Sequence, residues 1–358
     1  MIMKKERVVV AMSGGVDSSV AAALLKKQGY EVVGITMCFG LSDTAGKRPA
    51  CCGIQGIEDA RRVAHKLGIK HYVLNMQKIL KERVIKDFCD EYARGRTPNP
   101  CVRCNQFIKF GLLLKKALAL GAGFLATGHY ARIVKARQGY QLKKAKDLFK
   151  DQSYFLYRLG ASQLKHILFP LGDYTKKEVR ELARGFNLPV ADKLDSQEIC
   201  FLPKGDYREF LSQQIKQGIK PGLVVDKEGN ILGRHKGIAF YTIGQREGLG
   251  IARGYPLYIN KIDSRQNRIT AGKKEDASGT VFLINEPHFI QEPLKKKVVL
   301  RVKIRYNHKE DLADAIPVKN KLKIKFRKPQ FAITPGQSAV LYNKGIVIGG
   351  GIIDEVLI

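Results

Sequence analysis

The sequence of 358 residues predicts an α/β protein, a doubly wound parallel sheet followed by two β-rich sections. Three observations predict this class. Strand-like and helix-like runs alternate from the start of the chain to about Leu142, as in a parallel sheet covered by helices. From Pro221 onward, glycine turns separate short alternating runs, which is typical of all-β structure. The length is sufficient for two or three domains, each with its own core.

The first section alternates short buried strands with helices. The strands are predicted at Val8–Ala11, Glu31–Thr36, His71–Asn75 and Phe124–Ala126. The helices are predicted at Val16–Gln28, Ile57–Leu67, Ile79–Arg94 and Asn105–Leu120. Ligands of such sheets bind beyond the carboxyl ends of the strands. The loop Ser13–Ser19, Met37 and the turn Thr127–His129 fall at these ends, so we expect them to line one crevice.

The remaining elements follow in order. A hairpin is predicted within Lys135–Lys150, with its turn at Gln138-Gly139. Helices are predicted at Ser162–Ile167 and at Lys176–Phe186, the second with Thr175 as its N-cap. After Asp206–Gln217 the pattern becomes β-rich. The strand-like runs there are Val224-Val225, Ile238–Tyr241, Leu257–Ile259, Val298–Ile304, Leu322–Phe326, Ala339–Tyr342 and Ile346–Ile348.

The first strand runs into Ser-Gly-Gly-Val-Asp-Ser-Ser at Ser13–Ser19, after which a helix begins. Adjacent glycines allow successive backbone N–H groups to point at one anion, and the new helix adds its positive end. The Ser18 and Ser19 hydroxyls add further polar groups. The segment has no Gly-Lys-Ser/Thr, the pattern whose lysine reaches the phosphates in kinases and GTPases. It therefore predicts a different kind of phosphate site.

The composition indicates the class of partner. Lysine and arginine total 63 against 33 acidic residues, a formal net charge of +30. This excess predicts a large polyanion as the partner. Basic residues that could form a second contact surface for it are Lys295–Lys297, Arg301, Arg305 and Lys319–Lys328. We find no secretory signal and no run of about 18 apolar residues, so we expect a cytoplasmic protein and no membrane.

The seven cysteines are the second source of chemistry, because cysteines in a reducing compartment are more typical of catalysis or metal binding than of disulfides. Cys101 and Cys104 form a Cys-x-x-Cys pair, which taken alone fits half of a zinc knuckle, a redox pair or small buried residues. A thiolate at a helix N-terminus beside Arg103 is stabilised by dipole and charge, which predicts a nucleophilic Cys104. Cys200 lies in another polar-to-apolar loop. We expect Cys38, Cys51 and Cys52 near the site and Cys89 in a helix core.

The Ser-Gly-Gly-x-Asp-Ser pattern resembles the PP-loop of ATP pyrophosphatases, and the whole chain is similar to the bacterial tRNA-specific 2-thiouridylases. The matching segments run in order along the chain: Ala11–Ser19, Gly34–Met37, Arg96–Pro100, Cys104-Asn105, Ile108–Phe110, Ala126–Tyr130, Lys150–Tyr154, Asp195–Gln197, Ile199–Phe201 and Tyr241–Arg246. The resemblance implies a PP-loop, adenine-nucleotide hydrolase-like catalytic domain at residues 1–215. It also implies a small central β-rich domain at 216–278 and a C-terminal, tRNA-contacting β-barrel at 279–358.

The resemblance also implies roles for individual residues. The implied ATP contacts are Ala11, Met12, Ser13, Gly14, Gly15, Val16, Asp17, Ser18, Ser19, Met37 and Gly128. The implied tRNA contacts are Asn99, Pro100, Cys101, His129, Lys150, Asp151, Gln152, Arg305, Tyr306 and Gln337. The implied catalytic residues are Asp17, Cys101, Cys104 and Cys200, with Cys104 as the nucleophile and Cys200 as the persulfide carrier.

The implied reaction is 2-thiolation of the wobble uridine, position 34 of tRNA. ATP adenylates uridine O2 with release of pyrophosphate, Asp17 helps to place Mg²⁺, and sulfur then replaces AMP at C2. The anticodon stem-loop binds with its target base flipped out, because chemistry on a stacked base is sterically blocked. The implied sulfur donor is a cysteine desulfurase, a sulfur-relay protein or free sulfide.

Cys101 departs from the family pattern, in which many members carry aspartate at this position. It resembles the branch of thiouridylases in which three cysteines hold an iron–sulfur cluster, which implies Cys101, Cys104 and Cys200 as metal ligands. The alternative is a two-cysteine relay. In that version a persulfide on Cys200 delivers sulfur and Cys104 closes a disulfide.

Two other classes of function also fit part of the sequence. Another PP-loop enzyme, an amide-forming ligase acting on a small acid, explains pyrophosphate release but neither the thiols nor the charge of +30. A non-enzymatic, metal-stabilised RNA-binding protein explains the charge and the Cys-x-x-Cys pair, but it leaves the nucleotide loop without a role. Release of AMP only in the presence of tRNA distinguishes the thiouridylase from both.

Overall fold

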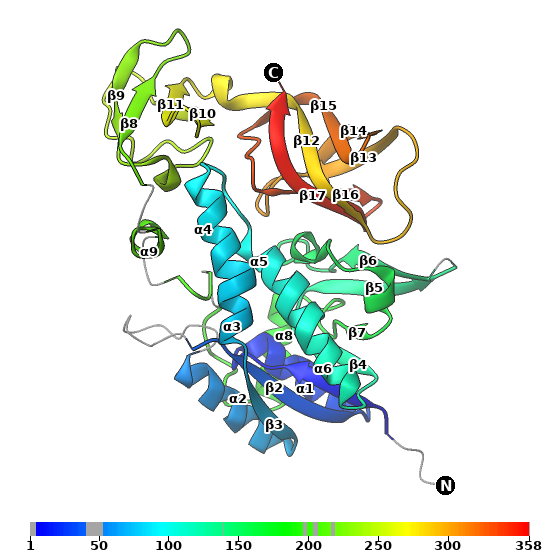
Figure 1. Cartoon of the computed structure of the whole chain (residues 1–358). Coiled ribbons are helices and arrows are strands. Elements are labelled where there is room, and N and C mark those ends of the chain that lie inside the picture. Colours follow the sequence, from blue (N-terminus) through cyan, green and yellow to red (C-terminus); the bar gives the residue numbers. More distant parts are fainter. Residues whose placement is uncertain are drawn as a thin grey trace. The chain divides into compact units, whose positions relative to one another are not determined.

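The computed structural model describes residues 5–40, 53–137, 139–195, 199–202, 207–215 and 219–357 (Figure 1). Its chain divides into two compact units. Unit 1 comprises Met1–Val84, Cys101–Lys204 and Lys344–Val347, and unit 2 comprises Ile85–Pro100, Gly205–Asn343 and Ile348–Ile358. Among the described residues, no helix has the length and apolar character needed to cross a membrane.

Unit 1 contains a parallel five-stranded sheet, in the order β3-β2-β1-β4-β7. Its strands are β1 (Arg7–Ala11), β2 (Glu31–Cys38), β3 (Lys70–Asn75), β4 (Phe124–Thr127) and β7 (Ile167–Leu168). Val8–Val10 are at most 1% exposed, because helices cover the sheet and leave the central strand no polar face. The strand order reverses between β1 and β4, which is where such sheets bind ligands. The predicted doubly wound parallel sheet is confirmed.

The helices of the chain follow the predicted pattern with local differences. The bounds are α1 (Val16–Lys27), α2 (Ile54–Leu67), α3 (Gln77–Leu80), α4 (Lys86–Ala93), α5 (Pro100–Arg103), α6 (Leu114–Ala119), α7 (Ala161–Leu164), α8 (Lys176–Gly185) and α9 (Tyr207–Gln214). Two π-helical segments, η1 (Lys81–Ile85) and η2 (Cys104–Leu113), continue α3 and α5. The helix predicted at Ser162–Ile167 ends at Leu164 because Ile167 pairs with Leu125 in the sheet.

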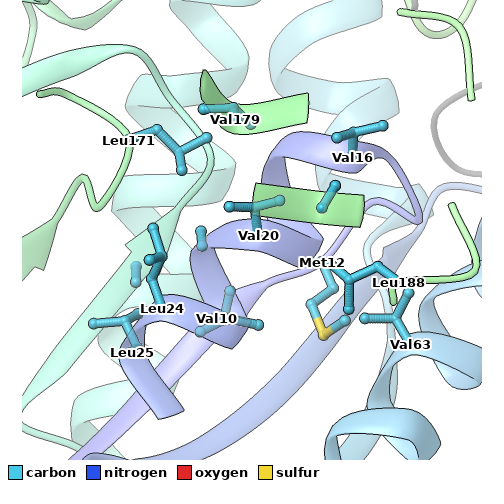
Figure 2. Close-up of a cluster of buried hydrophobic side chains, with 14 of the residues drawn as sticks. Val10, Met12, Val16, Val20, Leu24, Leu25, Val63, Leu171, Val179 and Leu188 are labelled. Carbon is cyan, nitrogen blue, oxygen red and sulfur yellow. The ribbon is translucent and has the colours of Figure 1, made fainter. Parts of the chain in front are cut away.

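The core of unit 1 forms around α1 (Figure 2). Val10 and Met12 from the first strand and its loop, Val20 and Leu24 from α1, and Val179 from α8 are buried together. The alanines of α1 have almost no exposed surface, so neighbouring elements pack closely against it. This core fixes the start of α1, which is the end of the phosphate loop.

Short elements lie between β4 and β7 in unit 1, and α8 follows β7. The predicted hairpin is present as β5 (Ala131–Ala136) and β6 (Gly139–Lys144), and Gln138 lies outside the described residues. The 3₁₀ turn η3 (Ser153–Leu156) comes after it. Thr175 caps α8 as predicted: its hydroxyl accepts the Glu178 N–H, and the Glu178 carboxylate accepts the Thr175 N–H.

Unit 2 contains two β-structures. The smaller is a sheet in the order β10-β11-β8-β9, made of β8 (Gly222–Val225), β9 (Ile231–His235), β10 (Tyr258–Asp263) and β11 (Arg268–Gly272). The strand predicted at Ile238–Tyr241 is wrong, because Ile238–Phe240 form a 3₁₀ turn, η4. Gly237, at a φ of +145°, precedes that turn, and Ile238 and Tyr241 are buried in the core of the sheet.

The larger β-structure is an antiparallel barrel of six strands. They are β12 (Ser278–Phe289), β13 (Val298–Lys303), β14 (Asp311–Val318), β15 (Lys321–Phe331), β16 (Ser338–Asn343) and β17 (Ile346–Leu357). Pairing of β12 with both β15 and β17 closes it. Phe282, Ile324 and Phe326 fill its interior. The predicted β-rich central section and C-terminal β-barrel are therefore confirmed.

Candidate active site

The predicted phosphate loop joins β1 to α1. Gly14 has a φ of +70°, and a Cβ at this position would lie 2.2 Å from the carbonyl oxygen of Gly56. Both facts require glycine. Gly15 is extended and forms the N-cap of α1. The first backbone N–H groups of α1 have no partner within the helix, so they form a site for an anion beside Gly15.

The serines hold the shape of this loop. The Ser18 hydroxyl accepts the Ser13 N–H at 3.1 Å and donates to the Gly15 carbonyl at 3.2 Å. The Ser19 hydroxyl donates to the same carbonyl at 2.8 Å. Ser18 and Ser19 are both buried. Their hydroxyls therefore stabilise the loop, a role that the sequence does not predict.

A second loop lies directly against the start of α1. A Cβ on Gly128, in the turn after β4, would lie 2.7 Å from the backbone carbon of Asp17 and the backbone nitrogen of Ser18. The turn after β4 and the phosphate loop thus meet where the strand order reverses, as the sequence predicts. Met37, the penultimate residue of β2, is buried.

Asp17 belongs to an ion-pair network. Its Oδ1 accepts the Tyr130 hydroxyl at 2.9 Å and Lys176 Nζ at 2.7 Å. Lys176 Nζ also lies 2.8 Å from Asp195 Oδ1. Burial and the Asp17 carboxylate raise the pKa of Tyr130, so the phenol stays protonated and donates. Lys176 therefore joins the phosphate loop to Asp195.

A cavity of about 380 Å³ lies beside Lys193, a residue that contacts the loop, and is lined by Gln55, Asp59, Arg62, Val190, Ala191 and Lys193, among others. Lys193 Nζ donates to the Gly14 carbonyl at 3.0 Å and lies 2.5 Å from Asp59 Oδ2, while Arg62 pairs with Asp59 Oδ1. Burial raises the pKa of Asp59, but the hydrogen bonds from Lys193 and Arg62 outweigh it and hold this pKa below its usual value. Asp59 thus stays charged and fixes Lys193 at the loop.

The Cys-x-x-Cys pair lies one turn further along its helix than predicted. The helix begins at Pro100, a residue suited to the first helical position, and not at Asn105. Cys101 is therefore in the first turn and is exposed, while Cys104 opens the π-helix η2 and is 8% exposed. The helix N-terminus is therefore beside Cys101, and the predicted position of Cys104 at the start of the helix was wrong.

The π-helix η2, which begins at Cys104, is fixed by close packing at Gly111 and by a hydrogen bond from Asn105. A Cβ on Gly111 would lie 2.7 Å from the Gln106 carbonyl oxygen, so the wide turn accommodates only glycine there. Asn105 Nδ2 donates to the Phe155 carbonyl at 3.1 Å, which ties this helix to the residues that follow Lys150–Gln152. Such π-helical insertions are frequent at functional sites.

The remaining cysteines differ in environment. Cys200 is half-buried. Burial, followed by the nearby Asp90, raises the pKa of the Cys89 thiol to about 11, so that it stays protonated as expected of a packing residue. Cys51 and Cys52 lie outside the described residues. Within the described ranges, no three Cys, His, Asp or Glu side chains come together as a group that could hold a metal, so Cys101, Cys104 and Cys200 are not arranged as cluster ligands.

Comparison with known proteins places the whole chain. Residues 6–204 match the tRNA methyl transferase HUP domain, 208–273 the tRNA methyl transferase PRC-barrel domain and 280–353 the aminomethyltransferase β-barrel domain. A protein named tRNA-specific 2-thiouridylase MnmA 1, from Caldanaerobacter subterraneus subsp. tengcongensis, is 52% identical over 357 residues, 98% of each chain. The chain belongs to the tRNA-specific 2-thiouridylase family.

Two further relatives of that name have the same extent. The one from Halothermothrix orenii is 50% identical over 98% of this chain and 99% of its own. The one from Clostridium acetobutylicum is 48% identical over 97% of this chain and 99% of its own. The family membership predicted from the motifs is thereby confirmed.

In this member of the 2-thiouridylase family, several candidate tRNA contacts of unit 1 have internal partners. His129 is 9% exposed, with Nδ1 2.7 Å from Thr127 Oγ1, and burial and Lys109 hold its pKa well below the usual range. Asp151 is buried and accepts the Ala145 N–H. Gln152 Oε1 accepts the Tyr130 N–H. Lys150 is the more exposed, and its Nζ lies 3.2 Å from Asp195.

The candidate tRNA contacts of unit 2 lie in two places. Gln337 Nε2 donates to the carbonyls of Thr97, at 2.9 Å, and Pro98, at 3.3 Å, so it holds the segment that ends in Asn99 and Pro100. Arg305 Nη1 donates to the Phe331 carbonyl, and Lys303 Nζ lies over the Tyr306 ring.

Sequence reasoning missed the side chains that surround the phosphate loop. These are Asp59, Tyr130, Lys176, Arg180, Lys193 and, as a charged group, Asp195. The signal was weak: Tyr130 and Asp195 fall inside matching segments, but nothing in a single sequence pairs Lys176 with a carboxylate 159 residues away.

Proposed function

We propose that this chain is an ATP-dependent tRNA-uridine 2-sulfurtransferase that thiolates the wobble uridine. One observation supports this above all: a pyrophosphatase-type phosphate loop and a Cys-x-x-Cys helix occur in one chain that matches 2-thiouridylases over nearly its whole length. The family descriptions mention methyl transfer, but methyl transfer gives no role to a loop shaped for a polyphosphate.

The first half-reaction activates the base. The C2 carbonyl of uridine is a poor electrophile because its oxygen cannot leave. Attack of O2 on the α-phosphorus of ATP forms an adenylated uridine and releases pyrophosphate. The N–H groups at the start of α1 stabilise the departing phosphates, and Asp17 would hold Mg²⁺, which would neutralise their charge.

The second half-reaction delivers sulfur. The terminal sulfur of a Cys200 persulfide attacks C2, and AMP departs with the former O2. The Cys104 thiolate then attacks the Cys200 sulfur, which breaks the S–S bond, leaves sulfur on the base and forms a Cys104–Cys200 disulfide. A cysteine desulfurase, relay protein or other persulfide source supplies the sulfur, and a thiol reductant resets the pair.

The iron–sulfur cluster stays a prediction. Three thiolates suit a cluster with one open iron. The described Cys101, Cys104 and Cys200 do not form a three-ligand group, so the proposed steps do not involve a cluster. Iron and labile sulfide contents of anaerobically prepared protein test it.

For the partner, we propose the anticodon stem-loop of tRNA, attracted by the net charge of +30. In this proposal residues 1–215 hold ATP and the cysteines, 216–278 form the central domain, and the barrel at 279–358 contacts the RNA. A cytoplasmic location fits such a substrate.

The experiment that tests the function measures AMP release from ATP with tRNA, without tRNA, and with a panel of small carboxylic acids. AMP that forms only with tRNA, together with 2-thiouridine, is the expected result. AMP release with a small acid identifies an amide-forming ligase, and tRNA binding without AMP release identifies an RNA-binding protein.

A further inference from the structure

Phe149 has the most exposed large apolar side chain in the described part of the chain. It is 98% exposed, and its neighbour Leu148 is 69% exposed. A phenyl ring that stays in water forfeits the free energy that its burial would give. Single exposed apolar residues are common on protein surfaces, but this ring is held rigidly and lies beside the phosphate loop.

Hydrogen bonds fix the turn that carries Phe149. Asp147 Oδ1 accepts the Phe149 N–H at 3.1 Å and the Lys150 N–H at 3.3 Å, and the Asp147 carbonyl also accepts the Lys150 N–H, at 3.2 Å. Before the turn, the Lys146 N–H donates to the Gly172 carbonyl at 2.9 Å. The backbone under the exposed ring is therefore ordered without a partner, which lowers the entropic cost of binding one.

The turn lies beside the phosphate loop, because Lys176 spans the two. The Lys176 N–H donates to Asp147 Oδ2 at 3.0 Å, and its Nζ lies 2.7 Å from Asp17 Oδ1. Asp17 is the second residue of α1, at the end of the helix where we propose that the phosphates of ATP bind. A base that is adenylated there has its neighbours in the RNA chain close to this turn.

The surroundings of the ring are basic. Residues 141–150 contain one acid, Asp147, and four lysines: Lys143, Lys144, Lys146 and Lys150. Lys146 lies 3.1 Å from Glu178 and Lys150 lies 3.2 Å from Asp195, and such exposed pairs hold their lysines only weakly. Proteins bind unpaired nucleotides with this combination, in which an aromatic ring stacks on a base and cations contact the backbone. A protein partner is less favoured, because lysine is depleted at protein–protein interfaces.

We infer that Phe149 stacks on an unpaired base of the anticodon loop, next to the target uridine. When uridine 34 is flipped out for adenylation, the bases beside it lose a stacking partner. The Phe149 ring takes the place of that partner and holds the loop in the form in which uridine 34 reaches the nucleotide. The inference rests on the proposed function, since it takes the substrate RNA from it.

The first test uses fluorescence. The chain contains no tryptophan, so Phe149→Trp introduces a single indole that can still stack. We expect the anticodon stem-loop to quench most of the emission of this variant. The control is Leu120→Trp, because Leu120 is 61% exposed and precedes the amino end of β4, at the edge of the sheet opposite the phosphate loop. Emission from Phe149→Trp that bound RNA leaves unchanged would overturn the inference.

The second test measures affinity for the stem-loop. Phe149→Ala should bind about tenfold more weakly than the wild type, as expected for the loss of one stacked base. The dependence of affinity on salt should not change, because the ring carries no charge. Leu148→Ala, which removes an exposed apolar side chain without a ring, should keep the wild-type affinity. An unchanged affinity of Phe149→Ala, or an equal loss in Leu148→Ala, would contradict stacking.

Stem-loops with an abasic nucleotide on the 5′ or the 3′ side of uridine 34 identify the stacked base. With one of them, the wild type and Phe149→Ala should bind equally, because the variant and the missing base remove the same contact. A tenfold difference that persists with both abasic stem-loops would show that no neighbour of uridine 34 stacks on this ring.

These measurements separate the inference from the function on which it rests, because RNA binding requires no turnover. If the wild type releases AMP with tRNA but the Phe149 variants bind RNA as their controls do, the stacking alone is contradicted. If Phe149 stacks on RNA in a chain that never releases AMP with tRNA, the function alone is contradicted. A defect of Phe149→Ala only toward a protein persulfide donor, at wild-type RNA affinity, would assign the ring to a protein partner and overturn the inference.

Discussion

Gly128 leaves no room for a side chain against the first turn of α1. A methyl group there would lie 2.7 Å from backbone atoms of Asp17 and Ser18, which cannot move without displacing the phosphate loop. We expect Gly128→Ala to lose AMP formation and about 1–3 kcal/mol of stability, the usual effect of overpacking. Gly160→Ala is the matched control, because its nearest neighbour lies at 3.8 Å. Normal AMP release by Gly128→Ala in the tRNA-dependent assay would contradict the placement of the site.

The two proposed sulfur-handling cysteines should separate the half-reactions. We expect Cys104→Ala and Cys200→Ala each to release AMP with tRNA yet form no 2-thiouridine, because adenylation precedes sulfur transfer. Cys89→Ala serves as control, since a thiol with a pKa of about 11 is not a nucleophile at neutral pH. Nucleoside analysis by mass spectrometry measures the product. Near-normal thiolation by either site variant would show that its cysteine has another role.

His129 predicts a pH dependence of stability. Burial and Lys109 lower its pKa in the folded chain below the ordinary 6.5, so the unfolded chain binds the proton more readily. The contribution of the neutral His129 side chain to the free energy of unfolding is therefore complete above about pH 6.5. It is lost as the pH falls from there toward the pKa of His129 in the folded chain, by at most about 1.4 kcal/mol per pH unit. Urea unfolding at pH 7.5 and 5.5 should show a smaller loss for His129→Gln than for the wild type. Equal losses would mean that His129 is solvated in the folded protein.

Single residues were predictable where a short motif fixes the backbone. Gly14, Gly15 and Gly128 lie in the turns after their strands, as the sequence predicts, because a strand that runs into glycine is a local pattern. The pairing of Asp17 with Lys176 was not predictable, since two charges separated by 159 residues carry no local signal.

At the scale of elements, η2 is the feature closest to the proposed chemistry. We expect Gly111→Ala to push the Gln106 carbonyl away, alter the π-helix that Cys104 opens, and cost about 1–3 kcal/mol. Thiolation should then fall more than AMP release. Gly185→Ala, at the end of α8 with no atom within 4 Å, is the control. Equal effects on both half-reactions would show that η2 does not position Cys104.

The elements themselves were predicted where hydrophobic periodicity was strong. All strands of the parallel sheet except the two-residue β7 were expected. In the barrel, β12 and β14 were missed, because Gly279 and Pro287 interrupt the first and the buried face of the second is made of Ala313 and Ala315, residues of weak strand preference. A π-helix cannot be read from apolar spacing at all.

For the whole molecule, the net charge of +30 predicts how binding depends on salt. The logarithm of tRNA affinity should fall linearly with the logarithm of salt concentration, because each neutralised phosphate releases counterions. Lys295→Gln with Lys296→Gln should flatten the slope by about 0.7–0.9 for each phosphate that these lysines neutralise in the wild type. Filter binding over a salt series measures it. An affinity for tRNA that does not change with salt concentration would contradict the prediction, drawn from the net charge, that the partner is a polyanion.

The order of a parallel α/β section followed by β-rich sections was predictable from the sequence, because helices and strands differ in the period of their apolar residues. The boundaries at 215/216 and 278/279 stay predictions. In the structure, Ile85–Pro100 group with unit 2, whereas the cysteine helix that follows them groups with unit 1. The sequence does not predict this division, because it depends on long-range contacts such as that of Gln337 with Thr97.

In the proposed mechanism, ATP activates the O2 atom of uridine for replacement by sulfur. The most direct test uses tRNA carrying ¹⁸O at O2 of uridine 34, incubated with the protein, ATP, Mg²⁺ and a persulfide donor, with mass spectrometry of AMP and of the nucleosides. We expect one ¹⁸O in the AMP formed for each 2-thiouridine. Unlabelled AMP beside retained ¹⁸O in the uridine, or thiolation with ¹⁸O released to water, would contradict it.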